Sequence, residues 1–330
     1  MRKKHIKVKK NRRDFIKKTG VSLGSLFLVP SHVLFGKKEI KDVNGKVVQK
    51  AVTLPNDKIN LACCGIGNRG ASVIRDLYST GAANVISLCD VNLGAEKTIK
   101  SMQMHPSASQ YKDFRKMLEE MGDQIDAVGV GTPDHTHFAI TYMAMSMGKH
   151  VFVEKPLVHS LWEARTLQAL AKEKKVVTQM GNQGHAFEGA YLVKEWYEAG
   201  LIGEVKEVIT WTDRPARGWG FNGQVRTSYP PAEKIPEGMD WDLWLGPCQE
   251  DVPFSRAIHP TTWRPWWSFG CGGLGDIGCH TIDTAYWALG LGAPDRVEVD
   301  MTEKANPCLL YTSDAADERS SVDLGGRRII

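Results

Sequence analysis

The sequence predicts an α/β protein built on a doubly wound parallel sheet. Two observations lead to this fold class. Apolar runs of strand length alternate with helical stretches between residues 59 and 180, and a glycine-rich turn joins the first run to the first helix. Because parallel neighbours require a crossover connection, this alternation favours a sheet with helices on both faces.

The first unit of the sheet spans residues 59–90. Residues 59–64 form a short apolar run that leads directly into the turn Gly65-Ile66-Gly67-Asn68-Arg69-Gly70. Residues 71–78 continue as a helix with apolar side chains at core spacing, and residues 85–89 form the next buried strand, which ends at Asp90. This order of strand, turn, helix, strand and acid predicts a dinucleotide-binding unit.

Each key residue of this unit has a physical reason to bind a dinucleotide. Gly65 allows a tight turn, Gly67 lets the backbone approach a diphosphate, and Gly70 lets the helix pack closely against the strand. The helix N-terminus offers N–H groups and a positive dipole end to phosphate. Asp90 is placed to accept hydrogen bonds from ribose hydroxyls and to repel a 2′-phosphate, so we expect NAD rather than NADP.

The remaining predicted elements follow in chain order. Helices are expected over residues 114–121, 138–147, 161–174 and 275–289, and strands over residues 125–131, 150–153, 176–180, 205–212 and 296–301. In a sheet of this kind the ligand binds at the carboxyl ends of the strands. Asp90, Thr132-Pro133, Lys155 and Gly181-Asn182-Gln183 all follow predicted strands, so we expect them at one edge.

The charge of the chain is unevenly distributed. The 330 residues have a formal net charge of +4, but residues 1–18 contain ten Lys or Arg and one Asp, a local +9. The remaining residues therefore sum to about −5. The basic balance belongs to the leader, and nothing in the rest of the chain predicts nucleic-acid binding.

The leader resembles a twin-arginine export signal. Asn11-Arg12-Arg13-Asp14-Phe15-Ile16-Lys17-Lys18 has paired arginines, a polar residue, two apolar residues and lysines, and an uncharged, mildly apolar stretch follows to residue 36. This stretch is too weakly apolar for a membrane span. We expect export by the Tat translocase to the periplasm or an equivalent location. An ordinary basic tail is the alternative.

Domain boundaries follow from these patterns. Residues 1–36 are the predicted signal segment, 37–57 a polar irregular linker, 58–181 the NAD-binding domain and 182–307 a second α/β domain. Residues 308–330 resemble the translation of a sequencing adapter, and we expect them to be non-native. The seven Cys match no zinc or disulfide spacing, and Cys63, Cys64 and Cys89 fall in predicted core strands.

The chain changes character beyond residue 204. Residues 213–264 are irregular and rich in Pro, Gly and Trp, and nine of the ten Trp follow residue 195. So many aromatic residues indicate binding loops rather than disorder. Their flat faces suit stacking on sugar rings, although a place in an inter-domain core is the better expectation for any single Trp.

Several motifs occur in the order of a known family. They are the glycine turn, Asp90, TPDHTH at residues 132–137, EKP at 154–156, GNQGH at 181–185 and GGLGDIGCH at 272–280. With them, residues 59–307 resemble the Gfo/Idh/MocA family of nicotinamide-dependent oxidoreductases, and most closely its exported branch, which carries the WDLWLGP stretch found at 241–247. The resemblance implies a Rossmann domain followed by an α/β domain with a large, open, mostly antiparallel sheet. It also implies a homo-oligomer. The chain ends earlier than the family pattern, so we expect that sheet to be incomplete.

The resemblance places the catalytic lysine at Lys155. A lysine at a strand end beside the nicotinamide is partly desolvated and faces a positive ring, and both effects help it to give up its proton. Pro156 biases the backbone of Lys155 to an extended shape, which would aim the side chain. A surface lysine is the alternative.

Asp276 and His280 form the second pair of catalytic candidates. Four residues apart on a helix, they share one face, and similar enzymes place such a pair against the substrate. We expect His280 to exchange the hydroxyl proton with Lys155, and Asp276 to orient substrate or imidazole. A helix cap with a satisfied core histidine is the alternative. A metal site with His185 is a further reading that we do not favour, because hydride transfer needs no metal.

Other contacts are predicted from their position in the motifs. The cofactor candidates are Gly65, Gly67, Asn68, Arg69, Gly70, Asp90, Thr132, Pro133, His137, Glu154, Lys155 and Gln183. The substrate candidates are His185, Arg214 and Trp267. For Arg69 a solvated surface arginine is an equal alternative, for His185 helix capping is an equal alternative, and for Arg214 a surface role is the stronger one.

Together these residues predict an exported dehydrogenase that acts on a sugar or polyol. Lys155, helped by His280, would remove the hydroxyl proton as hydride leaves to NAD. A glycosidase that uses NAD transiently is the alternative enzyme: oxidation acidifies a neighbouring C–H, the aglycone is eliminated, water adds and hydride returns. A protein that holds the nucleotide without turnover is the third hypothesis.

Overall fold

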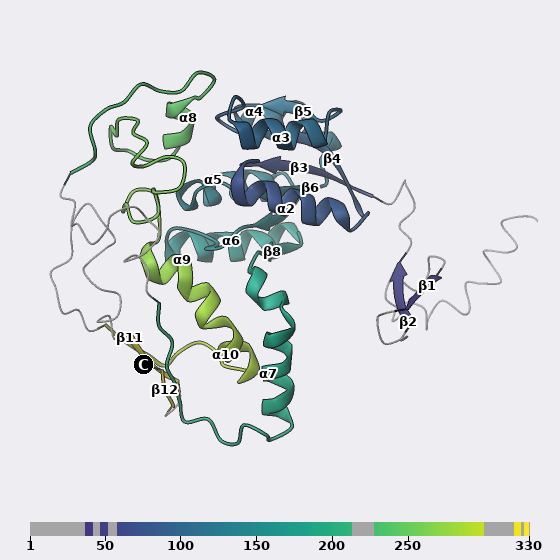
Figure 1. Ribbon diagram of the computed structural model, residues 1–330, viewed down its shortest axis with the longest axis vertical. Helices are drawn as coiled ribbons and strands as arrows, with labels where there is room; N and C mark the ends of the chain where they lie inside the picture. Colours follow the sequence, from purple (N-terminus) through teal and green to yellow (C-terminus); the bar gives the residue numbers. More distant parts are fainter. Residues whose placement is uncertain are drawn as a thin grey trace, which may run out of the picture. The chain divides into compact units, whose positions relative to one another are not determined.

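The predicted parallel sheet has six strands in the order β5-β4-β3-β6-β7-β8. A computed structural model describes residues 37–41, 47–51, 58–212, 228–299, 320–324 and 327–329. The strands are β3 (Ile59–Cys64), β4 (Ala83–Cys89), β5 (Ser109–Tyr111), β6 (Ala127–Val130), β7 (His150–Val153) and β8 (Thr178–Met180), and every neighbouring pair is parallel. All their carboxyl ends therefore meet at one edge (Figure 1).

Helices cover this sheet, and successive residues of β3 enter two separate cores. The helices are α2 (Asn68–Ser79), α3 (Glu96–Met104), α4 (Phe114–Met121), α5 (Asp134–Ser146) and α6 (Leu161–Lys174), with a short 3-10 turn η4 (Gly122–Gln124). Ala62 and Cys64 pack with side chains of α4, α5 and α6, whereas Leu61 and Cys63 pack with side chains of α2. Alternate side chains of β3 thus pack against helices on opposite faces of the sheet, which confirms the doubly wound arrangement.

Most predicted bounds of this half agree with the structure, with one shift that affects the site. Helix α4, strand β7 and helix α6 have the predicted bounds, and α6 begins with a capping box between Ser160 and Glu163. Helix α5 begins at Asp134, four residues before the predicted start at Phe138. His137 is therefore a helical residue and not part of a loop.

The second half contains short helices and a four-stranded sheet. Its elements are η5 (Gln183–Ala186), α7 (Glu188–Glu198), β9 (Glu207–Val208), α8 (Trp241–Leu245), α9 (Gly272–Thr281), α10 (Asp283–Ala288), β10 (Arg296–Val299), β11 (Ser320–Leu324) and β12 (Arg327–Ile329). The sheet order is β10-β11-β12-β9, with two antiparallel pairs and one parallel pair. Strands β11 and β12 come from residues 308–330, whose non-native origin stays a prediction.

Two predictions for this half need correction. The helix expected over residues 275–289 is divided at Ile282 into α9 and α10. The strand expected over residues 205–212 is reduced to the two residues of β9. In both places the side-chain pattern continues past the end of the element, so periodicity alone overestimated its length.

The tryptophan-rich stretch forms a core of its own. Its fully covered members are Met239, Trp241, Trp244, Val252, Phe254, Ile258, Trp263, Trp266 and Phe269. Trp241 and Trp244 stack with ring centroids 4.4 Å apart. Most of these aromatic faces pack against one another, which agrees with a core position although this core lies within the second half and not between domains. They hold the connection between α8 and α9 in place without regular secondary structure.

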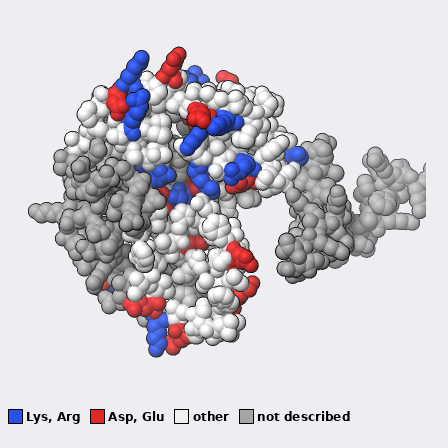
Figure 2. Space-filling model, viewed as in Figure 1, with Lys and Arg blue, Asp and Glu red and all other residues white. Residues whose placement is uncertain are grey.

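The surface of this half differs from that of the parallel sheet. In Figure 2, charged atoms of both signs are interspersed over the upper part of the face, while the part below, over α7, α9 and α10, shows mostly uncharged atoms around its centre. Tyr191 and Trp196 of α7, Phe187 next to it and Leu274 of α9 are all exposed. A patch of exposed aromatic and aliphatic side chains of this kind marks a surface suited to association.

Residues 1–58 form a separate compact unit from residues 59–330. In this first unit the structure describes β1 (Lys37–Lys41) and β2 (Val47–Ala51), which pair in antiparallel register. The prediction that residues 37–57 have no regular structure is therefore wrong for residues 37–41 and 47–51. The dipeptide Asn44-Gly45, between two strand-like runs, is a hairpin signal that the sequence analysis missed. The predicted export signal lies outside the described residues.

Candidate active site

A cavity of about 780 Å³ lies at the carboxyl ends of β3, β4, β6 and β7. Strand-end and turn residues supply part of its lining: Gly65, Gly67, Asn68, Arg69, Asp90, Thr132, Pro133, Glu154, Lys155 and Gln183. The second half of the chain supplies Asp242, Leu243, Trp244, Gly246, Pro247, His259, Pro260, Thr261, Trp263, Arg264, Asp276, Ile277 and His280. Two regions far apart in sequence thus enclose one space.

The glycine turn is built by close backbone contacts that leave no room for a side chain at Gly65 or Gly70. Gly65 has a φ of +74°, and a Cβ added to Gly70 would lie 1.7 Å from the Gly65 carbonyl oxygen. A Cβ on Gly131 would lie 2.7 Å from the Cα of Gly70. Helix α2 starts directly after Gly67, which as the N-cap makes no side-chain capping bond. The first-turn N–H groups therefore face the cavity edge without a competing acceptor, an arrangement that fits a diphosphate.

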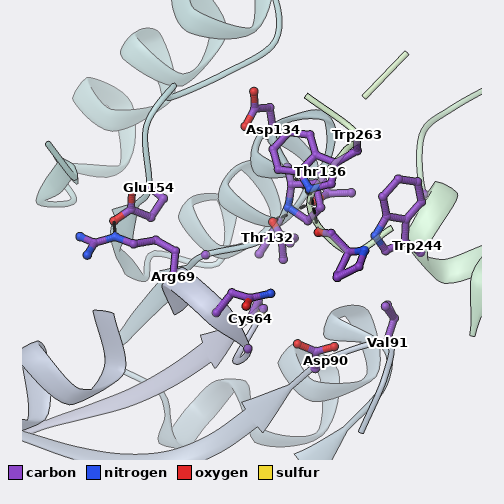
Figure 3. Close-up of a pocket in the computed structure, with 18 of the residues that line it drawn as sticks. Cys64, Arg69, Asp90, Val91, Thr132, Asp134, Thr136, Glu154, Trp244 and Trp263 are labelled. Atoms are coloured by element: carbon purple, nitrogen blue, oxygen red, sulfur yellow. Dashed lines mark hydrogen bonds and ion pairs between the residues drawn. The ribbon is translucent and has the colours of Figure 1, made fainter. Parts of the chain in front are cut away.

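Asp90 holds the turn from the end of β4. Its carboxylate accepts hydrogen bonds from the N–H groups of Ile66 and Asn92, both at 2.9 Å. Burial raises the pKa of Asp90, and these backbone donors oppose that shift. Each carboxylate oxygen keeps a second lone pair, so Asp90 can accept a ribose hydroxyl while it fixes the turn. Figure 3 shows Asp90 beside Cys64 and Val91 in the cavity wall.

Lys155 follows β7 directly and forms a buried ion cluster. Its Nζ lies 2.5 Å from Asp276 Oδ1 and donates to the Asp276 carbonyl oxygen at 3.0 Å. Arg264 Nε reaches the same carboxylate oxygen at 3.3 Å. The side chains of Lys155 and Asp276 are only 12% and 8% exposed. One carboxylate therefore faces two cations, and the cluster has one net positive charge where it borders the cavity. Asp276 contacts the lysine, and not the imidazole as one of its expected roles required.

His280 lines the same cavity one helical turn after Asp276. Burial lowers the pKa of His280, and the nearby charge of Lys155 lowers it further. The ring is thus neutral near pH 7, and a neutral imidazole has one nitrogen that accepts a proton. Lys155, Asp276 and His280, which the sequence placed in separate motifs, converge on one space.

Arg69 and Glu154 form an ion pair across the mouth of the turn. Arg69 Nε lies 2.9 Å from Glu154 Oε1, and the carboxylate is 6% exposed. Figure 3 shows the two side chains pointing toward each other from α2 and from the end of β7. Arg69 lines the cavity, but its own side chain is 38% exposed, so contact with a phosphate stays a prediction.

Two predicted histidines do not line the cavity. His137 is buried in α5, where its two ring nitrogens lie 2.7 Å from the Pro156 carbonyl oxygen and 2.8 Å from that of Thr132. It joins two strand-end loops and has no lining position. His185 Nδ1 lies 2.8 Å from Asp283 Oδ2, outside the cavity. Local hydrogen-bond partners engage both nitrogens of His137 and Nδ1 of His185, and direct contact of either ring with cofactor or substrate stays a prediction.

A second substrate candidate, Trp267, is also absent from the cavity lining. Trp267 is 58% exposed and is not among the lining residues. From the same loop, Trp263 and Arg264 line the cavity instead. Arg214 lies outside the described residues. Gly70 supports the turn through packing and does not itself border the space.

Sequence reasoning missed several lining residues that bring charge or aromatic surface. Among them are Asp134, Trp244, His259 and Arg264. Figure 3 shows Trp244 and Trp263 facing the cavity from the side of the second half, with Asp134 and Thr136 close to Trp263. Burial lowers the pKa of His259 to about 4, so this imidazole is also neutral. The run HPTTWRPWW at residues 259–267 was the available signal, since aromatic and basic residues in a loop indicate binding.

Asp134 makes the stability of the fold depend on pH. Its carboxyl accepts from the Cys271 N–H at 3.2 Å, and burial raises its pKa to about 7 from an ordinary value of 3.8. The folded chain therefore binds this proton more tightly than the unfolded chain. The resulting stability is present below about pH 4 and is lost as the pH rises to about 7, by at most about 4 kcal/mol.

Asp134→Asn should remove this dependence, because the amide oxygen still accepts from Cys271 and does not titrate. Urea unfolding of both proteins across this range should show the variant gaining on the wild type as the pH rises. Parallel stability curves for the two proteins would contradict a buried, protonated carboxyl at this position.

The fold and the cavity together are those of a Rossmann-type dinucleotide-binding protein. One family model, the oxidoreductase family with an NAD-binding Rossmann fold, matches residues 59–182, and a second, the C-terminal alpha/beta domain of the same family, matches residues 191–311. The chain belongs to the Gfo/Idh/MocA oxidoreductase family.

Known relatives include enzymes of two kinds. A levoglucosan dehydrogenase of Pseudarthrobacter phenanthrenivorans is 26% identical over 179 residues, which are 54% of this chain and 36% of the relative. A glycosyl hydrolase family 109 protein of Shewanella pealeana is 24% identical over 206 residues, 60% of this chain and 45% of the relative. The chain thus spans less than half the length of these relatives.

A solved structure supports the fold. GenD2 from gentamicin A biosynthesis, in complex with NAD, aligns with a TM-score of 0.59 at 20% identity, over 86% of this chain and 68% of that chain. Within the described residues, no helix is long and apolar enough to cross a membrane. In the same part of the chain, no three His, Cys, Asp or Glu side chains are grouped as metal ligands would be.

Proposed function

We propose that the protein is an NAD-dependent dehydrogenase that transfers hydride between a nicotinamide and a hydroxyl-bearing carbon of a sugar or polyol. The observation that carries the proposal is the shared cavity. The glycine turn and Asp90 border it in one region, and Lys155 and His280 border it in another. A volume of about 780 Å³ has room for a dinucleotide with a small substrate beside it.

The residues around the cavity have separate roles in binding and in proton transfer. The first turn of α2 binds the diphosphate, and Asp90 accepts from ribose hydroxyls. When bound, NAD supplies the hydride acceptor. Lys155 and His280 exchange the proton of the substrate hydroxyl, while Asp276, which also pairs with Arg264, holds the amine of Lys155 in position.

The walls of the second half support the exclusion of water from this step. The rings of Trp244 and Trp263 are 4% and 5% exposed, and both border the cavity. The relation to a levoglucosan dehydrogenase favours a carbohydrate as substrate. Asp90 favours NAD over NADP, because a second negative charge beside its buried carboxylate would be repelled.

A redox-neutral glycosidase is the second candidate function. The segment before α8 is fastened across the end of β4, where Asp240 N–H donates to the Val91 carbonyl oxygen at 2.8 Å and Met239 forms a bridge with Asn92. Such a strap favours a nucleotide that stays bound through many turnovers. The relation to a glycosyl hydrolase family 109 protein supports the same candidate.

One experiment separates these functions. Natively purified protein is analysed by mass spectrometry for a bound nicotinamide dinucleotide, and is then incubated with NAD and a panel of sugars and polyols that includes levoglucosan. A dehydrogenase forms NADH in proportion to substrate. A glycosidase releases sugar from an aryl glycoside with no net NADH. A protein that binds the dinucleotide and does neither is a nucleotide-holding protein, which would refute the proposal.

Export and association belong to the same proposal. The paired arginines at residues 12 and 13 support translocation by the Tat machinery, which exports folded proteins with their cofactor. The exposed Phe187, Tyr191 and Trp196 support association into a homo-oligomer through the surface of α7. Fractionation of cells and light scattering of the purified protein test the two parts separately.

A further inference from the structure

Asn182 stands between the parallel sheet and the helix that carries His280. It follows β8 and the glycine at residue 181, at the same edge as the cavity. Its amide makes two contacts with α9, almost one hundred residues further on in the chain. Nδ2 donates to the Cys279 carbonyl oxygen at 2.5 Å, and Oδ1 lies 2.7 Å from His280 Nδ1.

These two contacts determine how the amide is oriented. A carbonyl oxygen only accepts, so the group that faces Cys279 must be the amide NH₂. Cys279 lies in the last turn of α9, where carbonyl groups lack donors within the helix, and Asn182 supplies one. Turning the amide over would set two oxygens against each other. The atom that faces His280 is therefore the amide oxygen.

The charged groups around His280 favour its neutral form. Burial is the largest cause of its lowered pKa, and the positive charges of Lys155 and Arg69 act in the same direction. The carboxylates of Asp276 and Glu154 act against them. A neutral imidazole has a single N–H. Because the amide oxygen of Asn182 accepts, that N–H must be at Nδ1, and Nε2 carries the lone pair.

We propose that Asn182 is a positioning residue that fixes the imidazole of His280 in the tautomer protonated at Nδ1 and so leaves Nε2 as the proton acceptor at the cavity. This inference rests on the proposed function, since only a reaction with proton transfer gives Nε2 a task. Asn182 contacts neither the dinucleotide turn nor the ion cluster of Lys155 in the hydrogen bonds of the described residues. It acts through His280 alone.

The direct test is spectroscopic and needs no substrate. Long-range proton–nitrogen correlation spectra of protein labelled with ¹⁵N-histidine distinguish the two tautomers of a neutral imidazole. His280 is assigned by comparison with His280→Gln. We expect protonation at Nδ1 in the wild-type protein. Protonation at Nε2 would overturn the proposal, and this result is independent of any turnover.

Two variants of Asn182 test the consequence for the reaction. Asn182→Leu has no acceptor, and we expect kcat to fall about 10- to 100-fold with the KM for NAD little changed, as for the loss of an oriented acid–base group. Asn182→Asp keeps an acceptor for Nδ1–H. It loses the N–H that the Cys279 carbonyl oxygen accepts, so kcat should also fall. Its charge favours the imidazolium, so the acidic limb of the kcat profile should move to higher pH, which the leucine variant does not do.

Controls keep these outcomes distinct. Asn84→Leu changes an exposed asparagine on β4 and should leave kcat and the tautomer unchanged. An Asn182→Leu protein with wild-type kcat and tautomer would overturn the positioning role, and so would an Asn182→Asp protein whose acidic limb lies where that of the wild type does. If no sugar or polyol gives NADH with the wild type, the proposed dehydrogenase function is refuted. The tautomer measurement still tests the role of Asn182, because it needs no substrate.

Discussion

Replacing Lys155 with alanine is expected to lower kcat for the sugar or polyol substrate by about 10²- to 10⁴-fold, the range found when a positioned acid–base group is removed. The dissociation constant for NAD should change far less, because the helix turn and Asp90 hold the dinucleotide. The fold should persist, since Arg264 Nε remains 3.3 Å from the Asp276 carboxylate and leaves it paired. Steady-state kinetics and a fluorescence titration with NAD measure the two effects separately.

Lys155→Arg separates proton transfer from charge. Arginine keeps the cation beside Asp276, but its guanidinium does not release a proton at any accessible pH. The arginine variant should therefore be nearly as inactive as the alanine variant. Turnover close to that of the wild type would reduce Lys155 to a partner in the ion cluster and would leave His280 as the only acid–base group of the three.

The elements that the sequence predicted well are those whose buried faces are apolar. Strand β3 and helix α4 bury Leu, Met and Cys side chains, and their bounds agree with the structure. Helix α3 was not predicted. Its buried residues are Thr98 and Ser101, and the Ser101 hydroxyl donates to the Ile66 carbonyl oxygen at 2.6 Å. A helix that packs through hydroxyl groups gives no hydrophobic period to detect.

The residues of the candidate site also differ in whether the sequence could predict them. Gly65, Asp90 and Lys155 were predictable, because each follows a strand and the edge of a parallel sheet brings strand ends together. Arg264 and Asp134 were not, since their partners Asp276 and Cys271 are set by the packing of aromatic loops that have no period. Such contacts depend on tertiary structure, which spacing along the chain does not encode.

Gly70→Ala is expected to have the largest effect on the folded state. The new methyl group would lie 1.7 Å from the Gly65 carbonyl oxygen. No side-chain rotation can relieve this clash, because the position of each atom is fixed by the backbone. Helix α2 would have to move off the end of β3, which opens the diphosphate site at the same time. We expect a loss of about 3 kcal/mol or more in the free energy of unfolding, together with loss of NAD binding.

Two other glycines serve as matched controls for this effect. A Cβ on Gly189 meets nothing within 4 Å, and this residue lies inside α7, so Gly189→Ala should be neutral or slightly stabilising. A Cβ on Gly67 has its nearest neighbour at 3.5 Å, in Thr98. Gly67→Ala should therefore fold normally and weaken only the approach of the diphosphate. Denaturant unfolding and NAD titration of the three variants would contradict the turn geometry if Gly70→Ala behaved like Gly189→Ala.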